Sequence, residues 1–89
     1  VIGGEAGVFK LPSAITVAAG TATPAGGSTA ARLLLGTTAG FGIYYGSGAP
    51  TVSAGKGSLY LRSDGSSTST RSYVNTDGGT TWTNHVTAA

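Results

Sequence analysis

The sequence of 89 residues has no cysteine, no methionine and only three prolines. Without cysteine, neither disulfides nor cysteine-based metal sites can stabilise the fold. With so little proline, the chain is neither a collagen nor a proline-rich linker. Charged residues make up only 9% of the chain, against roughly 25% in an ordinary globular protein. More than half of the chain is glycine, alanine, serine or threonine, so few large side chains are available for a core.

Size adds to this shortage of core-forming residues. A chain of 89 residues forms one small domain at most, and a domain of that size buries only about 60% of its unfolded surface when it folds alone. Small chains that lack disulfides and structural metals are usually supported by association with other subunits. We therefore expect a homo-oligomer.

Charge and hydrophobicity each argue against one class of partner. The formal net charge is only +2 and the basic residues are scattered, whereas nucleic-acid binding needs clustered cations. No apolar run approaches the roughly 18 residues that a membrane-spanning helix requires. We expect neither a nucleic-acid partner nor a membrane partner.

The chain divides into a low-complexity arm at residues 1–30 and a small β domain at residues 31–89. The arm is rich in glycine, alanine and threonine, which return little buried area for the entropy lost on ordering. We expect it to be extended and to contact neighbouring subunits. Consecutive leucines after residue 32 pose a similar problem, because one face of a strand cannot hide them all. The candidate subunit-interface residues are Phe9, Leu11, Ile15, Val17, Leu33, Leu34 and Leu35.

Two apolar segments open the β domain. Residues 32–36 can form either a one-turn helix capped by Ser28 or Thr29, or a strand buried on both faces, and their length favours the strand. Residues 41–46 alternate bulky residues with glycine. A glycine inside a strand often marks the close approach of another backbone.

The clearest pattern is an approximate repeat of period 13. Residues 60–65 (Tyr-Leu-Arg-Ser-Asp-Gly) align with residues 73–78 (Tyr-Val-Asn-Thr-Asp-Gly), and each copy is an alternating run ending in Asp-Gly. Such a run is a strong hairpin signal. The fold class predicted is all-β with almost no helix: a small antiparallel β domain whose best-ordered part is a three-stranded meander within about 57–86. The expected strands are 57–63, 70–76 and 80–86.

The second turn belongs to a longer motif. Residues 75–82 (Asn-Thr-Asp-Gly-Gly-Thr-Thr-Trp) resemble an Asp box, a motif of sialidases and other β-propellers, at every defined position except the first, where Asn75 replaces serine. In those families the box is a structural hairpin distant from the catalytic residues. We therefore expect structural roles, with the carboxylate accepting hydrogen bonds from turn amides. The structural turn residues expected are Asp64, Gly65, Asp77, Gly78, Gly79 and Trp82.

The aromatic residues allow two interpretations. Trp82 is the only tryptophan, and in a small domain such a residue is more often core than surface. The alternative is a sugar-stacking platform that combines Trp82 with Tyr44 or Tyr45. Because adjacent strand residues point to opposite faces, at most one of these two tyrosines can join it.

Catalytic groups are scarce. There is one histidine, His85, and there are only three carboxylates, two of which lie in the expected turns. This set makes neither an oriented Ser–His–Asp arrangement nor a three- or four-ligand metal site. The glycine-rich stretches lack the Lys-Ser/Thr ending of a phosphate loop. We expect a protein that is not an enzyme and that uses no cofactor and no metal.

The second half of the chain carries a broader resemblance. Its strings are GSGAPTVSA at 46–54, GSLYLRSDG at 57–65 and TRSYVNTDGGTTWT at 70–83. Together they resemble a module found near the C-termini of tailed-bacteriophage structural proteins, in head-associated proteins and at the ends of tail spikes and fibres. The resemblance implies a virion component, usually trimeric, without catalysis in this module.

Length favours one location within the virion. An 89-residue chain can form a capsid decoration (cement) or head-fibre subunit that binds the major capsid protein or other virion proteins and stabilises the shell. The alternative is the C-terminal trimerisation module, or the receptor- or glycan-binding module, of a tail fibre or tail spike, with a host-surface glycan as partner. If the 89 residues are the whole protein, the decoration role fits better, because a tail spike needs an anchor and a large body. If they are a piece of a longer chain, a fibre or spike tip fits equally well or better.

Overall fold

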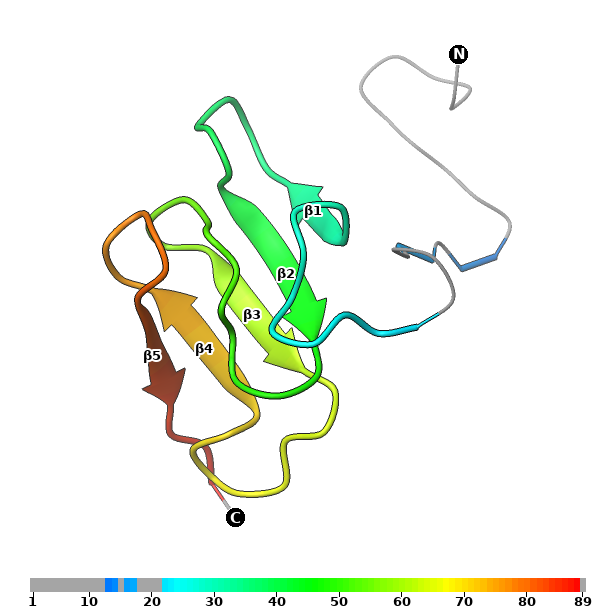
Figure 1. Cartoon of the computed structure of the whole chain (residues 1–89), viewed down its shortest axis with the longest axis vertical. Helices are drawn as coiled ribbons and strands as arrows, with labels where there is room; N and C mark the ends of the chain where they lie inside the picture. The colour runs from blue at the N-terminus through cyan, green and yellow to red at the C-terminus, as the bar shows by residue number, and fades with distance from the viewer. Residues whose placement is uncertain (1–12, 15, 18–21, 89) are drawn as a thin grey trace.

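The computed structural model describes residues 13–14, 16–17 and 22–88 of the chain. These residues contain five β-strands and no helix (Figure 1). The all-β prediction is therefore confirmed. The strands are β1 (Arg32–Leu34), β2 (Gly42–Gly46), β3 (Leu59–Arg62), β4 (Ser72–Asn75) and β5 (Trp82–His85).

The strands form one sheet in the order β1-β2-β3-β4-β5. The meander β3-β4-β5 is antiparallel, as its Asp-Gly turns predicted, and each strand lies inside the range expected for it. The sheet as a whole is mixed, however, because β2 and β3 are parallel. The expectation of a purely antiparallel domain did not include this pair, whose partners are too far apart in sequence for a local turn signal.

A parallel pair needs a crossover connection, and here residues 47–58 supply it. Such crossovers usually contain a helix, but this one is an irregular loop that passes over one face of the sheet (Figure 1). The Trp82 Nε1 donates a hydrogen bond to the Val52 carbonyl at 2.8 Å. The Ala54 amide donates to the Gly79 carbonyl at 3.0 Å. These bonds hold the loop down across β3, β4 and β5.

A second segment, residues 24–27, lies on the same face. The Gly26 amide donates to the Ser47 carbonyl at 2.7 Å, and the Thr51 amide donates to the Gly26 carbonyl at 2.9 Å. Gly27 has φ of 86°, and a Cβ there would lie 2.9 Å from a ring carbon of Tyr60. These residues fall within the expected 1–30 arm, yet they are hydrogen-bonded to the body. We call residues 24–27 and 47–58 together the roof.

The core beneath the roof is aromatic. Tyr44, Tyr60 and Tyr73 are direct cross-strand partners on β2, β3 and β4, and all three are buried. The Tyr60 and Tyr73 rings meet edge to face with centroids 5.8 Å apart. The Trp82 ring lies 6.0 Å from Tyr44 and 5.7 Å from Tyr60. The repeat of period 13 thus places its two tyrosines opposite each other, and Trp82 packs against the core.

Candidate functional site

The strands present two very different faces. Since successive strand residues point to opposite sides, the roof covers the face that carries Tyr44, Tyr60 and Tyr73, which we call the covered face. The opposite face carries nine side chains, none of which is buried. We call it the open face, and its residues are Leu33, Ile43, Tyr45, Leu59, Leu61, Ser72, Val74, Thr83 and His85.

Strand register arranges the open face in two rows. The first row crosses all five strands through direct partners: Leu33, Ile43, Leu59, Val74 and Thr83. The second row crosses β2 to β5: Tyr45, Leu61, Ser72 and His85. The aliphatic side chains are concentrated on β1 to β4, and the polar ones lie on β4 and β5.

Exposure and charge set this face apart. Leu33 is 52% exposed and Leu61 is 47% exposed. None of the nine residues is a lysine, arginine, aspartate or glutamate. A sheet face in contact with water normally carries polar residues, and a contiguous exposed apolar patch marks an interaction site. The open face is therefore the candidate functional site.

On the covered side, the Asp-box hairpin is held by side-chain hydrogen bonds. Asp77 Oδ1 accepts from the Gly79 amide at 2.8 Å and from the Thr81 amide at 3.2 Å. Hydrogen bonds from Thr81, and then from the Gly79 amide, hold the pKa of Asp77 below its ordinary value. Gly78 has φ of 78°, the left-handed region that the turn requires.

Asn75 occupies the position where the Asp box has serine, and it is 1% exposed. Its Oδ1 accepts from the Gly78 amide at 2.7 Å and from the Asp77 amide at 3.3 Å. Its Nδ2 donates to the Gly79 carbonyl at 2.8 Å. The Asn75 side chain thus makes three hydrogen bonds within the turn: its oxygen accepts two and its nitrogen donates one.

The first Asp-Gly turn uses its carboxylate differently. Asp64 Oδ1 accepts from Arg62 Nε at 2.8 Å and from the Gly48 amide at 2.9 Å. The hydrogen bond from Arg62, and then the one from the Gly48 amide, hold the pKa of Asp64 below its ordinary value. Arg62 Nη1 also donates to the Tyr73 hydroxyl at 3.2 Å. Asp64 therefore ties the β3–β4 loop to the roof.

Sequence reasoning named neither Arg62 nor Asn75 as important. A signal was present, because the two residues occupy equivalent positions in the repeat, two residues before each aspartate. Asp64 and Asp77 occupy the same position in the repeat, but it is Asp64 that accepts a hydrogen bond from the roof, donated by the Gly48 amide.

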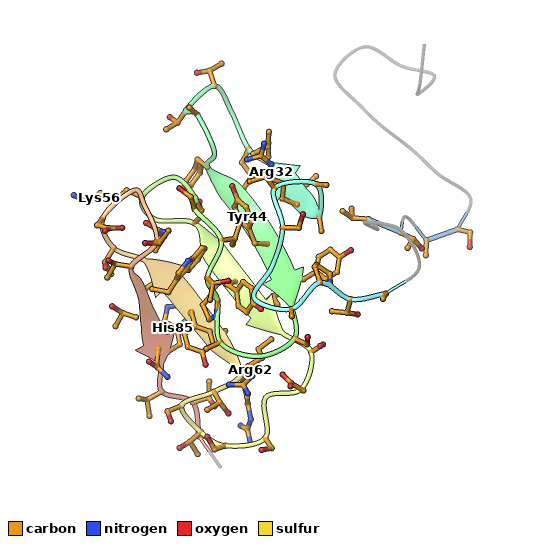
Figure 2. All side chains as sticks on the ribbon, viewed as in Figure 1. Arg32, Tyr44, Lys56, Arg62 and His85 are labelled. Atoms are coloured by element: carbon orange, nitrogen blue, oxygen red, sulfur yellow. The ribbon has the colours of Figure 1, made fainter. Side chains whose placement is uncertain are left out.

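Hydroxyl groups on the covered face meet backbone carbonyls. The Tyr44 hydroxyl donates to the Gly40 carbonyl at 2.6 Å and accepts from Arg32 Nη1 at 3.0 Å (Figure 2). Ser58 Oγ donates to the same carbonyl at 3.2 Å. The Tyr60 hydroxyl donates to the Gly48 carbonyl at 3.0 Å, and burial raises its pKa. Each of these polar groups is used to hold the fold.

The glycan platform weighed from sequence is not assembled. Tyr44 is 0% exposed, and the Trp82 indole is turned toward the tyrosines with its N–H bonded to Val52. Tyr45 alone among the three lies on the open face.

His85 lies exposed on β5, with Nδ1 3.2 Å from Ser72 Oγ (Figure 2). Among residues 13–14, 16–17 and 22–88, no three histidine, aspartate or glutamate side chains are close enough to hold a metal ion. The same described residues include no helix with the length and hydrophobicity needed to cross a membrane.

The candidate interface residues fall into three groups. Phe9, Leu11 and Ile15 lie outside the described residues, and Val17 is 40% exposed. Residues 32–34 form a strand rather than a helical turn, but the strand is not buried on both faces, because Leu33 and Leu34 are 52% and 50% exposed. Leu33 lies on the open face and Leu34 on the opposite side. Leu35, just after β1, is 41% exposed.

Comparison of the chain with protein-family models, with curated proteins and with solved structures found no match.

Proposed function

We propose that the chain is a non-enzymatic structural protein of a tailed-bacteriophage virion, a capsid decoration (cement) or head-fibre subunit that assembles as a homotrimer. The open face is the observation that carries the structural role. Its aliphatic side chains extend from β1 to β4, it has no lysine, arginine, aspartate or glutamate, and none of its side chains is buried. Such a surface is suited to burial against another protein.

Two further observations support this proposal. The strings within residues 46–83, which resemble the phage module, coincide with the roof and the meander. The polar side chains of this segment are engaged in turn and roof hydrogen bonds rather than grouped in a reactive cluster. The residues therefore serve stability and assembly.

Virus particles encoded by the same genome as the chain provide the test. Peptides of the chain should be found by mass spectrometry in purified particles, and antibodies against it should label the heads in electron micrographs. Labelling at the tail tip would support the alternative, a trimerisation or receptor-binding module of a tail fibre. Absence of the chain from purified particles would contradict both locations.

A further inference from the structure

We propose that the open face is the contact surface between copies of this chain, and that it packs against the open faces of the two other copies around the threefold axis of the homotrimer. This inference rests on the proposed function for its setting and names the surface that holds the assembly together. It uses only strand residues in β1 to β5, whose register places them on one side of the sheet.

The chemistry of the face selects the kind of occupant. An irregular segment lying on a sheet brings backbone amides and carbonyls that need partners. On the covered face, Trp82 and Tyr60 provide them through an indole N–H and a hydroxyl. The first row of the open face offers only aliphatic side chains from β1 to β4. The open face is therefore suited to a surface made of side chains, such as another sheet face, rather than to a loop.

Charge makes a second copy a compatible partner. Two open faces bring no lysine, arginine, aspartate or glutamate together, so no unpaired charge is buried and no like charges meet. The polar residues Ser72, Thr83 and His85 lie on β4 and β5, at one side of the aliphatic area. There they can form hydrogen bonds along one edge of the interface, beside its apolar part.

The dimensions fit a reversible contact. Five strands spaced about 4.8 Å apart and about four residues long give a face of about 19 by 13 Å. Two such faces bury less than the roughly 1,600 Å² of a standard stable interface. We expect association that depends on concentration in the purified chain and becomes stronger when several copies are held on one particle.

Sheet packing identifies the residues that matter most. Facing sheets lie about 10 Å apart with interdigitating side chains. Leu33 and Leu61 are the most exposed aliphatic residues of the open face, so they reach furthest toward a partner. Lysine at either position would place a charge in an apolar contact.

Sedimentation of the 89-residue chain from about 1 µM to about 1 mM tests the proposal. The average mass should rise above that of one chain, and a limiting mass of three chains would match the proposed homotrimer. Leu33→Lys and Leu61→Lys should each weaken association by about tenfold or more. The matched control is Leu34→Lys, whose wild-type side chain is 50% exposed on the other side of β1. This control should associate like the wild type.

Trp82 fluorescence verifies folding of each variant, because this ring lies on the covered face. A monomeric wild type at the highest concentration would overturn the inference, and so would an equal loss for Leu33→Lys and Leu34→Lys. If the chain self-associates but is absent from virus particles, the proposed function is wrong and this inference still holds. A monomeric chain present in particles would reject this inference alone.

Discussion

The two faces of this sheet reverse the usual distribution of side chains. The covered face is built mainly from tyrosine, tryptophan, asparagine and glycine, whereas every leucine, isoleucine and valine of strands β2 to β5 lies on the face without a roof. A roof of irregular backbone carries carbonyls that strand pairing does not satisfy. Aromatic residues with polar tips can bury a ring and still donate to those carbonyls. Aliphatic residues cannot, so they remain for a surface that brings only side chains.

The largest effect should come from the centre of the covered face. Tyr60→Ala removes a side chain that is 0% exposed and packs against Tyr73 and Trp82. Loss of the packing and the cavity left behind should cost about 3–5 kcal/mol of unfolding free energy, measured by urea denaturation. The milder Tyr60→Phe variant loses only the hydroxyl, which donates to the Gly48 carbonyl at 3.0 Å and lies 3.4 Å from the Ser47 carbonyl, and should cost about 1 kcal/mol. If Tyr60→Ala were as stable as the wild type, the covered face could not be the face that forms the core.

The next effect concerns the fit of the roof. Gly27→Ala would place a Cβ 2.9 Å from both Tyr60 and Val52 at a residue with φ of 86°. Backbone strain and overpacking together should cost about 2–4 kcal/mol. The control is Gly36→Ala, where φ is 69° but no atom lies within 4 Å. It should lose only about 1–2 kcal/mol from backbone strain, and equal thermal shifts in the two variants would argue against close packing of the roof.

The Asp-box hairpin gives an intermediate effect. Asn75→Ala removes three hydrogen bonds from a buried position and should lower the unfolding free energy by about 2 kcal/mol. Asn75→Ser restores the residue typical of the box and keeps one acceptor, so it should lie between the alanine variant and wild type. Asp77→Ala should also lower the melting temperature, and Asp77→Asn should lower it less, since it keeps an acceptor oxygen. A serine variant less stable than the alanine variant would contradict this role.

Acid should weaken the turns and the attachment of the roof. The folded-state pKa values of Asp64 and Asp77 lie below the ordinary value of 3.8, so each carboxylate stabilises the fold above that pH. This contribution is lost as pH falls through the folded pKa. The urea midpoint should therefore be level from neutral pH to about pH 5 and fall below about pH 4.

The double variant Asp64→Asn with Asp77→Asn should have a lower midpoint at neutral pH and a flatter acid limb. An acid limb as steep as that of wild type would show that other groups cause the loss.

On the alkaline side, burial raises the pKa of Tyr60 above 10.0. The contribution of the neutral Tyr60 hydroxyl to the unfolding free energy should therefore be complete below pH 10.0 and decrease as pH rises above this value.

The smallest effect on folding should come from the open face. Leu61→Ala, one residue from Tyr60 on β3, removes a side chain that is already 47% exposed. In dilute solution it should cost about 1 kcal/mol or less of unfolding free energy. Urea denaturation of this variant beside Tyr60→Ala compares the two faces within one strand. A loss as large as that of Tyr60→Ala would mean that the open face is part of the core of a single chain.

The meander could be predicted because its evidence is local. Each strand is an alternating run next to an Asp-Gly or Asp-Gly-Gly turn, and cross-strand pairing follows directly from a short connection. The position of Trp82 was open between core and platform, and the ring contacts with Tyr44 and Tyr60 show that it packs, partly buried, against the core. Arg62 was missed because its partner Tyr73 lies on another strand, and the two meet only because they share the covered face. The partners of Asn75 are amides two and three residues further along the chain, so its place in the turn motif already carried the signal.

The sequence by itself determined the all-β class, the three strands of the meander and the two aspartate turns, because strand alternation and turn chemistry act between near neighbours. Only the tertiary structure decided that β2 pairs in parallel with β3, that an irregular loop serves as the roof, and which face this roof covers. Alternation separates a strand into two faces but does not say which one is buried. Here long-range hydrogen bonding decided it, since the roof needed the polar tips of the tyrosines and the tryptophan and left the leucines exposed.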